Sequence, residues 1–234
     1  MSRSLRAFLQ SSIFKKQIAA VTGIILVLFI IGHLAGNLLI FAGPQALNEY
    51  AEKVLELGPF LWSFRIGLLA AFVLHVYFTI RVTQENRAAT AGRYAVTNPK
   101  GDWPFSRRTM VYTGLLVFFF LFLHLFDFTF ADHHGEGSVV MTGDGAMNLG
   151  LFGLVWNSFL NPLRSLVYIL AVCAVGLHLS HGVQSLFQSL GVTHEHYTPL
   201  VQKGSIALGL VVAVGFSLIP IYVFIRHYTI GVGV

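Results

Sequence analysis

The stretch QIAAVTGIILVLFIIGHLAGNLLIF, residues 17–41, decides the fold class of this chain. It runs for about 25 residues without Asp, Glu, Lys or Arg, and a helix needs roughly 20 mostly apolar residues to cross a bilayer. The stretch is also longer than the apolar core of a typical secretory signal peptide. It therefore predicts a retained membrane-spanning helix.

Four further apolar stretches of similar length follow, at about 59–83, 109–131, 163–190 and 204–226. Of the 234 residues, 55% are hydrophobic and 11% are charged, and the mean hydropathy is +0.71. A soluble domain needs a more highly charged surface than this. We therefore expect an all-α fold, an integral membrane bundle of five transmembrane helices that forms one domain over residues 1–234. Residues 1–16 are expected to lie on the membrane surface as an interfacial segment.

Charged residues are unevenly divided between the connecting segments. Segment 1–16 has four basic residues and no acidic ones, the loop 84–108 has five basic against two acidic, and the loop 132–162 has no Lys or Arg. Basic residues stay on the cytoplasmic side, so the N-terminus is predicted inside and the C-terminus outside a bacterial cytoplasmic membrane. This distribution accounts for the net charge of +5 without nucleic acid as a partner. Trp62 and Trp156 are expected at the outer boundary, as in an aromatic belt.

Histidines inside the spans point to function. Ten are present, and one lies well within each of the first four predicted spans: His33, His75, His124 and His178. An imidazole in hydrocarbon is costly unless it is paired, so each is a candidate functional group. A hydrogen bond to a neighbouring helix is the alternative for any one of them. Four histidines on four successive helices favour a common role.

The expected depths of these histidines place them in two layers. A rise of about 1.5 Å per residue puts His33 about 24 Å and His124 about 22 Å above the inner boundary. The same rise puts His75 at about 12 Å and His178 at about 18 Å. The spacing predicts an outer and an inner pair, as two stacked haems with two histidine ligands each would need. Zinc would instead require three or four ligands converging on one point.

Residues near the histidines are candidates for contacts with such a group. Gly32 and Gly36 flank the first histidine, and Gly176 and Gly182 flank the fourth, where small residues leave room for a flat macrocycle. Helix–helix packing is the alternative for Gly32 and Gly36. The candidates for contacts with the haem propionates at the inner boundary are Lys15, Arg81 and Ser12, each with a topology or surface role as the alternative. His181 is a candidate for the propionates or for the quinone side.

Several motifs carry a family resemblance. They are IGHLAGN (31–37), LHVY (74–77), ENRAA (85–89) with RY (93–94), LHLFDF (123–128), LHLSHG (177–182), QSLG (188–191) and IP (219–220). With these motifs the chain resembles the cytochrome b subunit of succinate:quinone oxidoreductases, the succinate dehydrogenases and fumarate reductases. The likeness is to the form with one large anchor polypeptide and two haems, and it covers nearly the whole chain.

The resemblance implies two haem b groups, a distal one on His33 and His124 and a proximal one on His75 and His178; it does not imply a ligand at His181. It also implies two partners on the cytoplasmic face, a flavoprotein with FAD and an iron–sulfur subunit. Succinate chemistry would take place in the flavoprotein, because nothing in this chain resembles a dicarboxylate site. This chain would anchor the complex and pass electrons to or from quinone, which in the two-haem family is usually menaquinone.

Two other functions stay open at this point. One is the haem b anchor of a hydrogenase or formate dehydrogenase. The other is a haem-free transporter that uses the histidines as proton relays, although the sequence shows no internal inverted repeat. Glu56, just before the second span, is a candidate proton-linked residue near an outer quinone site, with a solvated loop carboxylate as its alternative.

Overall fold

The computed structural model describes residues 8, 11–90, 105–142 and 145–230. Five helical segments in it are long and apolar enough to cross a membrane: Ser12–Ala42, Pro59–Ala89, Thr109–Thr129, Pro162–Ser189 and Thr198–Tyr228. Each overlaps one of the predicted spans. The all-α membrane bundle expected from the hydropathy is therefore confirmed.

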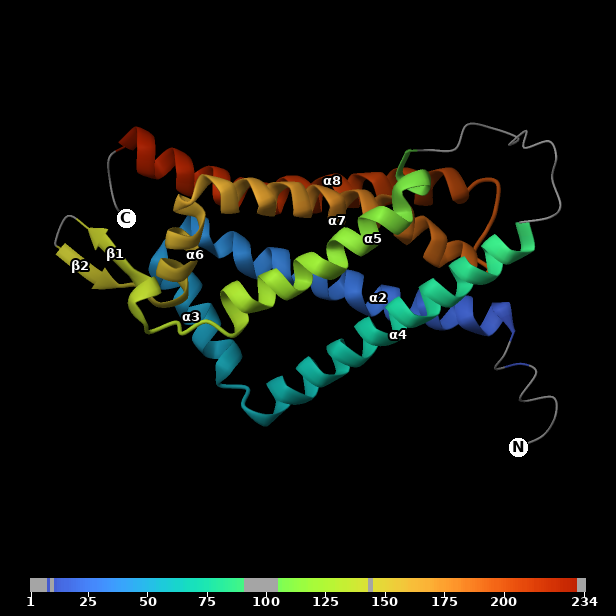
Figure 1. Ribbon diagram of the computed structural model, residues 1–234, viewed down its shortest axis with the longest axis horizontal. Helices are drawn as coiled ribbons and strands as arrows, with labels where there is room; N and C mark the ends of the chain where they lie inside the picture. The colour runs from blue at the N-terminus through green and yellow to red at the C-terminus, as the bar shows by residue number, and fades with distance from the viewer. Residues whose placement is uncertain (1–7, 9–10, 91–104, 143–144, 231–234) are drawn as a thin grey trace.

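The bundle consists of five long helices (Figure 1), and their bounds are α2 (Ser12–Asn37), α4 (Pro59–Thr90), α5 (Phe105–His124), α7 (Pro162–Ser189) and α8 (Thr198–Ile230). Local sequence explains where two of them begin. The Ser11 side chain caps α2 by accepting a hydrogen bond from the backbone of Phe14. Asn161 caps α7 in the same way, and Pro162 occupies the first turn, where its missing N–H is not needed.

Residues 12–16 of the segment predicted to lie on the membrane surface form the first turns of α2, so this helix begins before the expected start of the span at residue 17. Residues 1–7, 9 and 10 of that segment lie outside the described residues, as do 91–104 of the basic loop.

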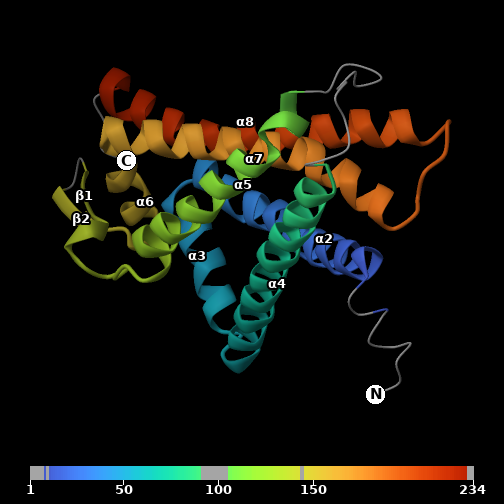
Figure 2. The same cartoon turned by 45° about the vertical axis from the view of Figure 1, so that its right-hand side comes forward.

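Helix α7 is the central helix of the bundle. In the most hydrophobic 18-residue stretch of α7, 39% of the residues are buried. In the corresponding stretch of α4, the share is 6%. Helix α7 packs against α8, α5 and α2, while α4 packs along α2 and diverges from α7 and α8 (Figure 2). The α7–α8 contact is close because Gly176 and Gly209 face each other: a Cβ on Gly176 would lie 2.5 Å from the Gly209 carbonyl oxygen.

Smaller elements gather at one end of the bundle, which we call the capped end (Figure 1). These elements are α3 (Pro44–Leu55), the antiparallel strands β1 (Val139–Thr142) and β2 (Gly145–Asn148), and α6 (Gly150–Leu160). The end of α8 also lies there, whereas α2 begins at the opposite end. The odd number of spans requires this arrangement. Neither α3 nor the hairpin was anticipated from the sequence.

Side-chain amides hold α6 in the capped end. Asn48 on α3 donates to the Leu149 carbonyl and accepts from the Phe152 N–H. Asn157 donates to the carbonyl of Gly137, before β1, and to that of Val139, the first residue of β1. Helix α6 is consequently buried, and Trp156 is only 1% exposed. The prediction that Trp156 belongs to an aromatic belt is wrong, because Trp156 lies on the buried face of α6 and packs in a core cluster with Ile40 and Val223.

Two pairs of histidines across the bundle

The histidine pair nearer the capped end joins α2 to α5. His33 lies one turn before the end of α2, and His124 is the last residue of α5. Their ring centroids are 5.6 Å apart, and the ring planes are nearly perpendicular, at 87°. The two residues predicted as the outer pair thus face each other directly.

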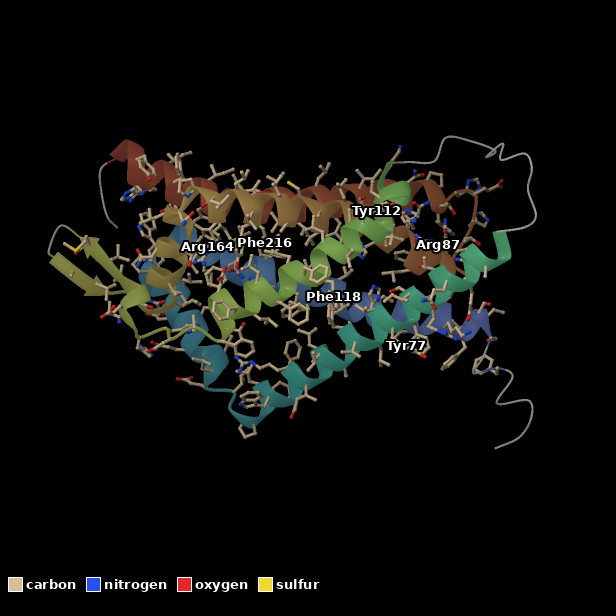
Figure 3. The ribbon with its side chains drawn as sticks, viewed as in Figure 1. Tyr77, Arg87, Tyr112, Phe118, Arg164 and Phe216 are labelled. Atoms are coloured by element: carbon tan, nitrogen blue, oxygen red, sulfur yellow. The ribbon has the colours of Figure 1, made fainter. Side chains whose placement is uncertain are left out.

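Aromatic rings surround this pair. Phe29 stacks on the His33 ring at 5.3 Å, and Phe216 of α8 approaches it at 5.7 Å (Figure 3 labels Phe216). Phe128 and Tyr168 lie against the His124 ring at 5.5 and 6.3 Å. These aromatic neighbours come from four different helical segments. The Asn37 amide nitrogen is a polar neighbour, 3.4 Å from both ring nitrogens of His33.

The other two histidines lie at a level farther from the capped end, His75 on α4 and His178 on α7. Nδ1 of His75 is 3.1 Å from the Ala19 carbonyl oxygen of α2 and 3.4 Å from the Thr22 hydroxyl. A carbonyl only accepts hydrogen bonds, so Nδ1 carries the proton and Nε2 keeps its lone pair.

His178 is held in the same way by α5. It hydrogen-bonds to the backbone of Met110, and its Nδ1 lies 3.3 Å from the Thr113 hydroxyl. Such a bond at one ring nitrogen fixes the tautomer and the orientation of a histidine that ligates a metal through the other nitrogen. Both inner histidines are therefore oriented by the neighbouring helix.

A glycine next to each threonine makes room for the inner imidazoles. A Cβ on Gly23 would lie 3.3 Å from Cε1 of His75, and one on Gly114 would lie 3.1 Å from Cε1 of His178. Sequence reasoning missed these four residues. A signal was present: a Thr-Gly dipeptide begins eleven residues before His33 and another begins eleven residues before His124.

The glycines that we expected to make room for a macrocycle have mostly other roles. A Cβ on Gly36 would lie 2.6 Å from the ring of Tyr50 on α3, so helix packing uses this site. Gly176 is used by the α7–α8 contact described above. A Cβ on Gly32 would meet nothing within 4 Å, and one on Gly182 would make an ordinary contact with Met110. Of the four, only Gly32 leaves open space.

The remaining candidates differ in their surroundings. Ser12, Arg81 and Glu56 are exposed, and Glu56 follows the end of α3. Lys15 forms an ion pair with Glu85 that links α2 to α4. The His181 ring accepts or donates a hydrogen bond with Ser185 at 3.1 Å, one turn later on the same helix.

Replacing Lys15 by Ala should lower the free energy of unfolding by up to about 1 kcal/mol, the usual range for ion pairs near a surface. The side chains of Lys15 and Glu85 are 14% and 35% exposed, so solvent screens the pair only in part. Lys16→Ala is the matched control, because Lys16 is an exposed neighbour. Unfolding in SDS, followed by circular dichroism, measures both. Equal losses in the two variants would show that the ion pair adds nothing.

The residues present fit haem in two respects. Imidazoles that bind one metal from opposite sides have ring centres about 6 Å apart, since each metal–nitrogen bond is about 2 Å; the centroids of His33 and His124 are 5.6 Å apart. The inner histidines have Nε2 available as a ligand. Within the described part of the chain, no three His, Cys, Asp or Glu side chains converge as they would for zinc. His33 and His124 form a pair of facing rings.

The chain was also compared with models of protein families, with curated proteins and with solved structures, and none of the three comparisons gives a match.

Proposed function

We propose that this chain is the dihaem cytochrome b anchor of a succinate dehydrogenase or fumarate reductase, and that it carries electrons between an iron–sulfur subunit and membrane quinone. The observation that carries the proposal is the pairing of histidines from non-adjacent spans. His33 of α2 faces His124 of α5 at 5.6 Å, at a different level from His75 and His178. The sequence motifs add the likeness to this family.

In this proposal His33 and His124 hold the outer haem and His75 and His178 hold the inner one. A bound haem would supply a one-electron carrier at each level. The protein orients the inner imidazoles through Thr22 and Thr113, and aromatic side chains keep water from the outer ones. His181, Lys15, Arg81 and Ser12 are proposed for the propionate side of the inner haem.

The partners in this proposal dock at the end where α2 begins. They are the FAD flavoprotein and the iron–sulfur subunit, and this end then faces the bacterial cytoplasm. Dicarboxylate chemistry stays in the flavoprotein. Quinone, proposed to be menaquinone, reacts at the capped end, so an electron crosses the membrane between the partners and the quinone. Moving one charge across involves about 2.3 kcal/mol per 100 mV of membrane potential.

The experiment that tests this function is a haem count on the purified complex together with a redox titration. We expect two haems per chain, a reduced-minus-oxidised band of cytochrome b type, and two midpoint potentials. A flavoprotein and an iron–sulfur subunit should copurify. Purified protein without haem would favour the transporter, and copurification of hydrogenase or formate dehydrogenase subunits would favour the other respiratory complex.

Replacing Gly114 by Leu should remove the inner haem and leave the outer one. The new side chain would push against the His178 ring, because even a Cβ lies 3.1 Å from Cε1. Gly204→Leu is the control, since a Cβ there would meet nothing within 4 Å. The measurement is the haem content and the number of midpoint potentials. Two unchanged potentials in Gly114→Leu would contradict the assigned inner site.

Replacing Glu56 by Gln tests its proposed role in proton uptake at the capped end. If Glu56 passes protons to quinone, the neutral amide should slow quinone turnover while both haems remain bound and reducible. Glu52→Gln is a matched control, because Glu52 is also an exposed residue of α3. Turnover equal to that of the unaltered protein would leave Glu56 as a solvated carboxylate.

A further inference from the structure

A buried carboxylate lies one turn after the outer ligand His124. Asp127 belongs to the π-helical turn Leu125–Thr129 at the end of the third span, and its side chain is 2% exposed. It is the one charged residue among the buried residues of the described part of the chain. A π-helical turn is often found at functional sites. The proposed haem ligation by histidines does not by itself require a carboxylate at this depth.

Two residues of α7 bind this carboxylate. The Tyr168 hydroxyl donates a hydrogen bond of 2.8 Å to Oδ2 of Asp127. An Arg164 guanidinium nitrogen lies 3.4 Å from Oδ1, and the Arg164 side chain, labelled in Figure 3, is 42% exposed. A buried charge needs such partners to stay ionised. Both carboxylate oxygens of Asp127 therefore have a partner on α7.

The exposure of the ion pair is asymmetric. The carboxylate is inside the protein, whereas the guanidinium reaches the surface, where solvent and salt screen its charge. The carboxylate, one turn after His124, is thus the charged group inside the protein at this level. Thr22 and Thr113, which contact the inner histidines, are buried and neutral.

Tyr168 connects Asp127 to the ligand. The tyrosine is 5% exposed, and its ring lies 6.3 Å from the His124 ring and 5.7 Å from Phe128. It also packs against Phe120 and Phe159 at 5.0 and 5.1 Å. The hydrogen bond to Asp127 anchors the free end of this ring, so the ring supports one side of the imidazole.

We propose that Asp127, paired with Arg164 and Tyr168, is a positioning residue that lowers the reduction potential of the outer haem and fixes the His124 ring. The inference rests on the proposed function. Reduction adds one electron, and so one negative charge, to the iron centre. A carboxylate nearby in a medium of low dielectric constant disfavours that step. The outer haem is then harder to reduce than it would be without Asp127.

Charge variants test this with a redox titration of the purified complex. Asp127→Asn should raise the outer midpoint potential by about 59 mV, which is tenfold in the equilibrium constant for one electron. Arg164→Gln should lower the same potential, by less, because its side chain is partly exposed. Asp132→Asn, an exposed residue at the same end, is the control. The outer titration is identified as the one that His33→Ala abolishes.

Opposite shifts of the outer midpoint potential in Asp127→Asn and Arg164→Gln support the inference. The shift caused by a purely structural disturbance would not depend on whether a negative or a positive charge was removed. The absence of a shift in both variants, or equal shifts in one direction, overturns it even if both haems are bound. Should Asp127→Asn not assemble, Asp127→Glu keeps the charge and must retain the original potential, and Arg164→Gln alone must lower it. An unaltered protein without haem would instead refute the proposed function.

Discussion

His33→Ala is expected to lower the haem content from two per chain to one. The substitution removes one of the two ligands of the outer haem, and the inner pair lies on the other two helices, α4 and α7. Loss of one imidazole also leaves the His124 ring with only its aromatic neighbours Phe120, Phe128 and Tyr168. The reduced-minus-oxidised absorbance should fall by about half, with one midpoint potential left.

Partner variants make this result specific. In a redox titration, His124→Ala should abolish the same midpoint potential as His33→Ala. His75→Ala and His178→Ala should both abolish the other midpoint potential. His134→Ala is the matched control, because His134 is exposed at the capped end. Loss of different titrations in His33→Ala and His124→Ala would show that the two rings do not share an iron. An unchanged haem content in all four variants would exclude these ligands.

Gly176→Val is expected to give the largest loss of stability. A Cβ at this position would lie 2.5 Å from the Gly209 carbonyl oxygen and 2.8 Å from the Ala213 methyl carbon. Backbone atoms cannot move aside as a side chain can, so α7 and α8 must separate. Overpacking in a close-packed interior costs about 1–3 kcal/mol, and separating the central helix also disturbs its contacts with α2 and α5.

Unfolding in SDS, monitored by circular dichroism, measures this loss. Gly204→Ala on α8 is the control, because a Cβ there would meet nothing within 4 Å. It should be neutral or stabilising, since Ala favours a helix over Gly by up to about 1 kcal/mol. A Gly176→Val protein as stable as the control would mean that α7 and α8 do not approach closely at this point.

The likeness to the oxidoreductase anchors was inferred from motifs, and it remains a proposal, as do the haems, the quinone and the partner subunits. The pairing of His33 with His124 is a different kind of result. It was predicted from residue counting along two helices, and the structure places the two rings in contact. Counting succeeds here because the rise of a helix is constant, so position along a span converts to depth.

Residue counting failed where contacts between helices decide the outcome. Gly36 and Gly176 were expected to make room for a macrocycle, but Tyr50 and Gly209 occupy the space beside them. Trp156 was expected in an aromatic belt, yet it lies on the buried face of α6. In the sequence, a small or aromatic residue looks the same whether it contacts a macrocycle or lipid or packs against another helix. Its neighbours come from segments far away in the sequence.

The sequence by itself determined that five apolar helices cross a membrane and that four of them carry a histidine, because hydrocarbon thickness and helical rise limit what such runs can form. Only the tertiary structure decided which groups orient those histidines. Thr22, Gly23, Thr113 and Gly114 contact imidazoles on another helix, and Asp127 meets Arg164 and Tyr168 across α5 and α7. The rotation and crossing of each helix set these contacts, and they depend on how all the packed surfaces fit together.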